Sequence, residues 1–406
     1  MSSLLLKDIT QVATAPASPV RGPAMRDLRV MTQASIYIKN GVIAAVGPLQ
    51  QIEKQIDDAV TILELAGHAV IPGFVDSHTH LVFAGTREEE FARKIAGATY
   101  QEIARGGGGI FKTVRDTRQA GEEELTAIAL KYLKSALRLG TTTMEVKTGY
   151  GLDLETELKL LRVIKKLHQL QPLELIPTFI GAHAVPPGKT VSQYTAEVIE
   201  MMPLMAGEAE FCDVFCEKGY FGVDETKAIL EAARQHGLKL RLHANQFSNN
   251  GGARLAVEMG ALSVDHLEQI SVDEIAALAN STTCATLLPG VSLFLNYGYP
   301  PARQIIDAGC IVALASDFNP GSCMCLNMQL IFSLACTQMR MTPAEALAAV
   351  TANAAYAVDR TQIGVIAPGQ QADLLVIDAP GYGMIPYFYG VNHVCQVIKK
   401  GEIVAG

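Results

Sequence analysis

The chain has 406 residues, of which 49% are hydrophobic and 18% charged, so it can bury a large core and does not have the composition of a disordered protein. It carries 33 Lys and Arg against 41 Asp and Glu, a net charge of −8, without a basic cluster, which argues against a nucleic-acid partner. Two long uncharged stretches, 275–302 and 318–339, are interrupted by Asn, Gly and Pro, so neither is expected to span a membrane. We expect a small-molecule partner.

The eight cysteines lie mostly in apolar runs, and the first residues lack the basic region and cleavage site of a signal peptide. The cysteine motifs do not have the paired spacing of a zinc finger, so we expect buried thiols rather than a cysteine metal site. Together these features predict a reducing, cytoplasmic location.

Both ends of the chain have the pattern of short β-strands separated by turns. Near the N-terminus, Asn40-Gly41 is a strong hairpin signal. Near the C-terminus, 372–378 and 397–404 are predicted as strands. Because chain ends commonly lie close together, residues 1–70 and 361–406 are expected to form one small β-sandwich domain.

Between these ends, over residues 71–360, short apolar β runs alternate with helical stretches, as in βα units around a parallel sheet. A doubly wound sheet is the main rival, but no Gly-rich phosphate turn follows the first run. Eight parallel strands over this length predict an α/β fold of the (β/α)8 barrel type. The predicted strands are 74–80, 142–147, 173–182, 211–216, 238–243, 262–266, 283–288 and 311–316.

Helices are expected over 122–139, 156–170, 224–236, 251–259, 273–279 and 343–357. Asp224 and Asp273 stand at two of these starts, and each carries the side-chain oxygen that an N-cap needs. We therefore predict that both residues cap their helices.

The first predicted barrel strand ends in His78-Thr-His80, and residues two apart on a strand project to the same side. This pair alone is weak evidence for a site. However, further residues lie at or just past the ends of the third, fifth, sixth and eighth strands, on the face where barrel enzymes build their sites. These residues are His183, His243, His266 and Asp317.

His78, His80, His243 and Asp317 make a set of three imidazoles and one carboxylate, which suits Zn²⁺ or Fe²⁺ and leaves a position for water. A bound divalent ion lowers the pKa of water to about 7 and polarises a carbonyl group. The combination predicts a metal-dependent hydrolase.

Three features resemble the amidohydrolase superfamily of metal-dependent barrel enzymes: the segment IPGFVDSHTH ending at His80, the split β domain, and LASD ending at Asp317. Residues 83–91, 106–110, 145–152, 181–184 and 317–322 resemble, more closely, the family within it that opens the imidazolone ring in histidine degradation. This resemblance covers essentially the whole chain. It implies hydrolysis of the cyclic amide of 4-imidazolone-5-propanoate to N-formimidoyl-L-glutamate, one metal ion per chain (Zn²⁺ or Fe²⁺/Fe³⁺), and a homodimer.

The resemblance also implies a set of substrate-binding residues. Arg87, in the first βα loop, is expected to hold the propionate carboxylate by a bidentate fork. Gln246 follows His243 by three residues, where some family members carry an acidic residue, and a neutral amide there has only a hydrogen-bonding role. The other expected substrate contacts are Tyr100, Tyr150, His183, Asn319, Gly321 and Ser322.

In the mechanism that these residues suggest, His266 orients or deprotonates the attacking water and Asp317 carries the proton to the departing nitrogen. His183 is the third residue expected to take part in catalysis. His266 has an alternative role, in which it only fixes a metal ligand. Lys147 is expected to form a salt bridge with Glu145 at the rim, in place of the carbamylated lysine that bridges two metals in related hydrolases.

Several alternatives stay open on the sequence alone. The barrel could belong to a deaminase of the cytosine or guanine type, to a cyclic amidase of the dihydroorotase or hydantoinase type that uses Lys147, or to a non-catalytic binding module. Histidine and aspartate ligands do not decide between zinc and iron. Residues 381–390, rich in glycine and tyrosine, could be a subunit interface or a buried turn.

Overall fold

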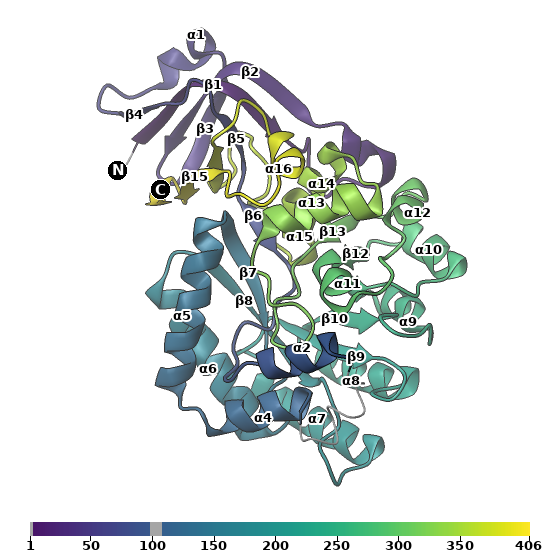
Figure 1. Cartoon of the computed structure of the whole chain (residues 1–406). Coiled ribbons are helices and arrows are strands. Elements are labelled where there is room, and N and C mark those ends of the chain that lie inside the picture. The colour runs from purple at the N-terminus through teal and green to yellow at the C-terminus, as the bar shows by residue number, and fades with distance from the viewer. Residues whose placement is uncertain (1–2, 98–107) are drawn as a thin grey trace.

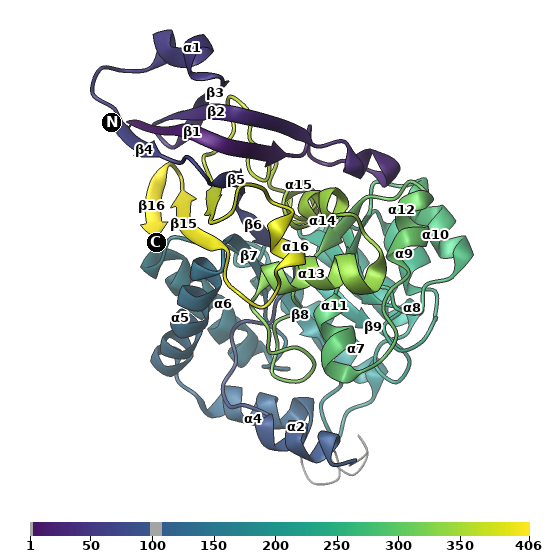
Figure 2. The same ribbon diagram turned by 45° about the horizontal axis from the view of Figure 1, so that its top comes forward.

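The computed structural model describes residues 3–97 and 108–406, so Tyr100 lies outside the described residues. Figure 1 shows a barrel of strands and helices with a small β domain against one side of it. In both Figure 1 and Figure 2 the two ends of the chain lie together in this small domain. The α/β architecture predicted from the sequence is confirmed.

All eight predicted β runs form strands of one parallel sheet, which follow one another in chain order. Their residues are almost all buried, because the strands have helices on one side and the barrel interior on the other, which explains their apolar sequences. The strands are β6 (Phe74–Asp76), β7 (Thr141–Lys147), β8 (Glu174–Ala182), β9 (Phe211–Cys216), β10 (Lys239–Ala244), β11 (Ser263–His266), β12 (Cys284–Leu287) and β13 (Val312–Leu314).

The first and last strands, β6 and β13, meet just beyond their ends. Thr79 and Phe318 form a parallel bridge there. His80 N donates to Phe318 O at 2.9 Å, and Asp317 N donates to His78 O at 3.0 Å. These contacts close the sheet into the predicted barrel and place the segments that carry His78, His80 and Asp317 side by side.

Helices surround the barrel. The expected helix 343–357 is interrupted at Thr351, whose backbone is not helical (φ −125°, ψ −91°). No helix in the described ranges is long and apolar enough to cross a membrane. The barrel helices are α2 (Glu88–Ile95), α4 (Ile110–Gln119), α5 (Glu122–Arg138), α6 (Leu154–Leu170), α7 (Val191–Met205), α8 (Val223–Gln235), α9 (Gly252–Met259), α10 (Val272–Ala279), α11 (Pro289–Leu295), α12 (Ala302–Asp307), α13 (Met328–Met339), α14 (Pro343–Val350) and α15 (Ala352–Ala357).

Both predicted N-caps are wrong. Helix α8 is preceded by Gly222, which makes no side-chain cap, and α10 is capped by Ser271. The Ser271 side chain accepts from the Glu274 backbone and the Glu274 side chain reaches back, which is a capping box. Asp224 and Asp273 lie in the first turns, where their charge favours the helix dipole without capping it.

The small domain combines both chain ends, as predicted, and its described strands are joined in one hydrogen-bonded sheet. Asn40 (φ 54°) and Gly41 (φ 79°) form the predicted hairpin turn between β2 and β3. The long strand β1 has a register shift between Leu6 and Ile9 and pairs with β4 before it and with β5 after it. The strands are β1 (Ser3–Thr14), β2 (Arg29–Lys39), β3 (Val42–Gly47), β4 (Thr61–Glu64), β5 (Ala69–Pro72), β14 (Leu374–Ile377), β15 (Val394–Lys399) and β16 (Glu402–Ala405).

The small domain is directly continuous with the strand that carries the first two histidines. Strand β5 leads into β6 through Gly73, whose backbone N donates to Asp373 O at 2.8 Å. A Cβ at Gly73 would lie 2.3 Å from Thr142 Oγ1 in the neighbouring strand, so only glycine fits there. The short helices outside the barrel are η1 (Gly22–Arg26), α1 (Leu49–Ile52), η2 (Glu53–Gln55) and α16 (Met384–Tyr387).

Candidate metal centre and substrate pocket

Three histidines and an aspartate converge at the carboxyl ends of the barrel strands. His80 Nε2 lies 3.4 Å from His243 Nε2 and 3.6 Å from Asp317 Oδ1. His78 Nε2 lies 3.4 Å from the same Asp317 oxygen. Ligand atoms about 2.0–2.1 Å from a tetrahedral zinc ion would be about 3.3 Å apart, so these atoms are spaced as metal ligands are.

Two of these atoms lack other partners. His78 Nε2 and Asp317 Oδ1 are buried and make no hydrogen bond within the described part of the chain. Buried polar atoms without a partner are costly unless something else binds them. The residues present therefore fit a divalent metal ion. The four side chains predicted as ligands, those of His78, His80, His243 and Asp317, lie close together in the structure.

His266, at the end of β11, lies close to this group. One ligand atom each from His78, His266 and Asp317 falls within 4.8 Å of the others, a set that overlaps with His78, His80 and His243. His266 (φ 83°), Leu267 (φ 70°) and Asp317 (φ 52°) all have left-handed backbone conformations. Non-glycine residues adopt this conformation infrequently, and it recurs at functional sites.

Carboxylates deeper in the barrel hold two of the histidine rings. Asp265 Oδ2 lies 2.7 Å from His78 Nδ1. Asp213 Oδ2 lies 3.0 Å from His243 Nδ1, and Asp213 Oδ1 accepts from His243 N at 3.1 Å. A carboxylate on one ring nitrogen fixes the imidazole orientation and directs the other nitrogen toward a metal.

Two buried cations balance these carboxylates. Lys147 Nζ donates to Glu145 Oε1 and to Asp213 Oδ2, both at 2.8 Å. Arg241 Nη2 donates to Asp265 Oδ2 at 3.1 Å. All five side chains are fully buried. The predicted pairing of Lys147 with Glu145 is confirmed, but its place at the rim is wrong, because both side chains point into the barrel interior.

The contacts of Lys147 fit an ammonium group. Burial alone would lower the pKa of Lys147, but the carboxylates of Asp213 and Glu145 raise it above its ordinary value. Carbamylation requires a neutral amine, which two adjacent carboxylates disfavour. Asp213, Asp265 and Arg241 were not predicted, although single charged residues inside the apolar strands FCDVFC, KLRLHA and SVDH are a visible signal.

Burial also sets the protonation of the ligand histidines. It lowers the pKa of His78 and His80 well below the usual range, and it lowers that of His243 despite the opposing charge of Asp213. Neutral imidazole is the form that binds metals. Burial raises the pKa of Asp317 to about 6, against the opposing effect of His266.

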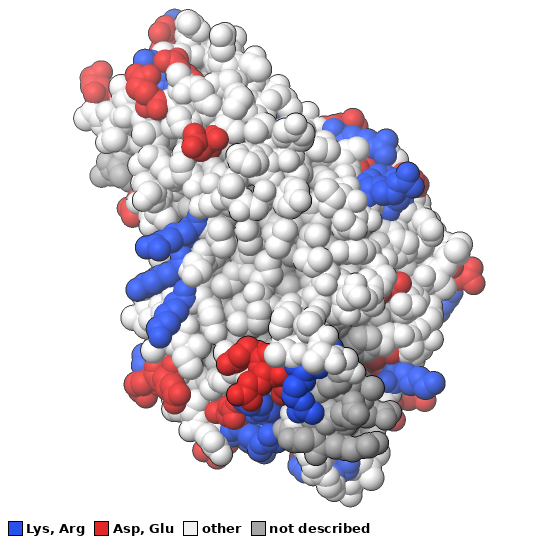
Figure 3. All heavy atoms as spheres, in the orientation of Figure 1, with Lys and Arg blue, Asp and Glu red and all other residues white. Residues whose placement is uncertain are grey.

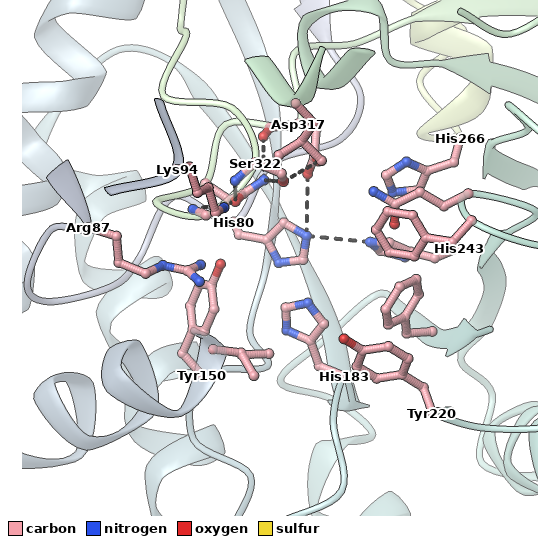
Figure 4. Close-up of a pocket in the computed structure, with 17 residues that line it drawn as sticks. His80, Arg87, Lys94, Tyr150, His183, Tyr220, His243, His266, Asp317 and Ser322 are labelled. Atoms are coloured by element: carbon pink, nitrogen blue, oxygen red, sulfur yellow. Dashed lines mark hydrogen bonds and ion pairs between the residues drawn. The ribbon is translucent and has the colours of Figure 1, made fainter. Parts of the chain in front are cut away.

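The metal-ligand cluster lies at one end of a cavity of about 640 Å³, a volume suited to a small molecule. Figure 4 shows Arg87, Lys94 and Tyr150 on one side of the cavity and His243 and His266 on the other. The predicted substrate contacts that the structure describes all line it, as does the unpredicted Lys94. These predicted residues are Arg87, Tyr150, His183, Gln246, Asn319, Gly321 and Ser322.

Two loops hold the side of the cavity near Arg87. A Cβ on Gly321 would lie 2.0 Å from Arg87 Nη2, so the guanidinium rests directly on this glycine. The loop that carries Tyr150 is fixed by the buried Glu157 carboxylate, which accepts from the backbone of Gly149, Gly151 and Leu152 at 2.8–3.0 Å. Arg87 and Tyr150 are thus preorganised.

His183 stacks on His80, with ring centroids 4.7 Å apart and planes 12° apart. Its Nδ1 lies 3.0 Å from the carbonyl oxygen of Gly149. Because a carbonyl oxygen only accepts, Nδ1 carries the proton and Nε2 is an acceptor. Burial lowers the pKa of His183 to about 3, so the ring is neutral at pH 7.

The amide side chains in the cavity differ in what they leave available. Asn319 is fully occupied: its Oδ1 accepts from the backbone of Gly321 and Ser322, and its Nδ2 donates to Asp317 O and Ser322 Oγ. It therefore shapes the loop after β13. Gln246 Nε2 donates to Tyr297 Oη at 3.4 Å, and its side-chain oxygen accepts no hydrogen bond from the described residues.

Comparisons with known proteins agree on the family. The model of the amidohydrolase family matches residues 69–404. The chain is 44% identical to imidazolonepropionase of Geobacillus kaustophilus, over 98% of this chain and 96% of that one, and 45% identical to imidazolonepropionase of Rubrobacter xylanophilus, over 99% of both. A crystal structure of adenosine deaminase from Xanthomonas campestris with bound zinc has the same fold, with a TM-score of 0.76, 18% identity, and coverage of 100% of this chain and 93% of that one.

Proposed function

The chain belongs to the amidohydrolase family, and within it to the imidazolonepropionases, and we propose that it hydrolyses 4-imidazolone-5-propanoate to N-formimidoyl-L-glutamate. The reaction is the hydrolysis of a C–N bond in a cyclic amide. The observation that carries the proposal is the cavity itself, which has a metal-ligand cluster at one end and the Arg87 guanidinium at the other (Figure 4).

The proposed cofactor is one divalent ion, Zn²⁺ or Fe²⁺, held by His78, His80, His243 and Asp317. Such an ion supplies Lewis acidity to the ring carbonyl and lowers the pKa of water toward neutrality. A single ion is favoured because Lys147, which would have to bridge a second one, is held as an ammonium group between Glu145 and Asp213.

Arg87 binds the substrate carboxylate, and its planar fork matches both carboxylate oxygens. The Tyr150 ring packs beside His80 and His183, with centroids 5.8 and 5.4 Å away. His183 Nε2 accepts a hydrogen bond from a ring N–H. Together these contacts orient the imidazolone with its carbonyl toward the metal-ligand cluster.

His266 and Asp317 handle the protons. Burial alone would lower the pKa of His266, but the neighbouring Glu268 raises it, which favours proton uptake from the attacking water. Asp317 Oδ1 faces His78 and His80, whereas Oδ2 faces Ser322 Oγ at 3.4 Å, so Oδ2 is the oxygen placed to pass a proton to the departing nitrogen. Water thus adds to the carbonyl carbon, the C–N bond breaks, and the nitrogen gains the proton.

The test uses imidazolone propionate generated in place from urocanate, with metal-loaded and chelator-stripped protein measured side by side. We expect metal-dependent loss of the imidazolone absorbance with N-formimidoyl-L-glutamate as the product. A metal-loaded protein that leaves the imidazolone unchanged would refute the substrate assignment.

We also propose a cytoplasmic homodimer. All eight cysteines lie in the described residues and are free, which fits a reducing compartment. The side chains of Tyr387, Phe388 and Tyr389 are exposed, and adjacent exposed aromatics fit an interface between subunits better than a buried turn. Sedimentation of the purified protein would test the dimer, and a monomer at micromolar concentration would contradict it.

A further inference from the structure

Helix α2 presents a second cation to the cavity. Arg87 immediately precedes the helix and Lys94 lies seven residues later, so two full turns place both on the same face. Both side chains line the cavity. Figure 4 shows them together on the side away from His243 and His266.

These two cations have no direct ion-pair partner in the part of the chain that the structure describes. Neither Arg87 nor Lys94 forms an ion pair with any residue of 3–97 or 108–406. The nearest acid along the helix, Glu90, is one turn before Lys94, and both its oxygens accept from Gly109 N at 3.1 Å. Burial and the like charge of Arg87 lower the pKa of Lys94, and the charge of Glu90 opposes this shift without reversing it.

Two adjacent cations that face a cavity are stabilised by an anion placed between them. An ionised carboxylate has about four lone-pair positions on two oxygens, and a bidentate arginine uses only two of them. The structure assigns to Lys94 a role as a second, specificity-determining contact to the carboxylate of the substrate. This assignment rests on the proposed function, in which Arg87 makes the first contact.

Lys94 therefore selects for the side chain of the substrate rather than for its ring. It lies away from the atoms that exchange protons, so its loss weakens binding of the ground state and the transition state equally. Such a loss raises KM and leaves kcat nearly unchanged.

The test compares Lys94→Met with Lys94→Arg and with the neighbouring control Arg93→Met, all as metal-loaded enzymes. Arg93 lies on the same helix with an exposed side chain and does not line this cavity. Figure 3 shows acidic and basic side chains side by side over α2, so we expect the loss of the Arg93 charge to change substrate binding little. We expect Lys94→Met to raise KM about tenfold with kcat within twofold, the effect of one charge-assisted hydrogen bond, and the other two variants to match wild type.

A second substrate separates binding from folding. The analogue 5-ethyl-imidazol-4-one keeps the ring and lacks the carboxylate, so Lys94→Met and wild type should turn it over with the same kcat/KM. If Lys94→Met loses kcat/KM equally on both substrates, or leaves KM for the acid unchanged, the assignment of Lys94 is overturned. Turnover of the acid by the wild-type enzyme would still uphold the proposed function in that case. Absence of wild-type turnover would overturn both. Melting temperatures measured in parallel, with Lys94→Gln as a second neutral variant, identify any variant that fails to fold.

Discussion

Asp213→Asn should weaken metal binding although Asp213 is not one of the proposed metal ligands. Its two oxygens contact three nitrogen atoms: Oδ1 accepts from His243 N at 3.1 Å, Oδ2 accepts from Lys147 Nζ at 2.8 Å, and Oδ2 lies 3.0 Å from His243 Nδ1. Asparagine has one acceptor oxygen. In its better orientation that oxygen keeps the contacts with the His243 ring and with Lys147. The amide NH₂ then faces the backbone N–H of His243, and both are donors.

The magnitude follows from two effects. Loss of a carboxylate that orients a ligand histidine typically costs 10–100-fold in metal affinity, about 1.4–2.7 kcal/mol. The buried donor left without a partner costs a further ~1–3 kcal/mol of folding stability in the metal-free protein. Metal affinity measured by competition with a chelator reports the first effect, and unfolding of the metal-free protein reports the second.

Asp373→Asn is the matched control. Asp373 is also buried and also contacts three nitrogen atoms, each of which donates to it: Lys399 Nζ at 2.7 Å, Lys400 N at 2.9 Å and Gln371 Nε2 at 2.9 Å. It lies in the small β domain, so its variant should lose similar stability and keep wild-type metal affinity. Unchanged affinity in Asp213→Asn, or an equal decrease in both variants, would refute the reasoning.

Three further variants test the substrate side of the cavity and the stability of the fold. Gly321→Ala should raise KM several-fold, because the added Cβ would displace the flexible Arg87 guanidinium. The melting temperature should change little, because the core is not disturbed. Steady-state kinetics and thermal unfolding measure the two effects. Glu157→Gln should lower kcat/KM about tenfold, since the loop that orients Tyr150 loses charge-assisted hydrogen bonds, and an unchanged value would contradict this. Glu345→Gln should lower the melting temperature most near neutral pH. Burial alone would raise the pKa of Glu345, but hydrogen bonds lower it below 4.5, so its contribution is present above that pH and disappears as the pH falls. A difference that grows on acidification would be the wrong sign.

The barrel could be predicted from the sequence because parallel strands are buried on both faces and so become continuous apolar runs. The proposed metal ligands could be predicted because the barrel fold places strand ends on one face. The spacing of His78 and His80 was weak evidence alone, and it became a prediction because the strand count places His243 and Asp317 on the same face.

The buried network could not be predicted in the same way, because it depends on register between strands. His243 lies opposite Asp265 in the pairing of β10 with β11, yet the ring that Asp265 holds is His78, from a strand far away in the chain. No local pattern contains that information. Lys94 was missed because no local pattern distinguishes it from a solvent-exposed charge. Helix α2 follows a predicted loop, and its charged residues have the composition of an ordinary solvated helix. The N-cap of α10 was missed because Asp273, in the first turn, was preferred over Ser271, whose capping partner Glu274 is visible three residues later.

Gln246 stands where some family members carry an acid, and the structure explains how a neutral amide fits there. Its Nε2 donates to Tyr297 Oη at 3.4 Å, and Tyr297 Oη donates to Glu268 Oε1, also at 3.4 Å. Glu268 Oε1 in turn lies 3.8 Å from His266 Nδ1. An amide has no titratable proton, so this chain of contacts orients Tyr297 and Glu268 without carrying charge itself. The acidic group on this side of the cavity is then Glu268, which acts on His266 directly, and the proposed proton transfers through His266 and Asp317 need no acid at position 246.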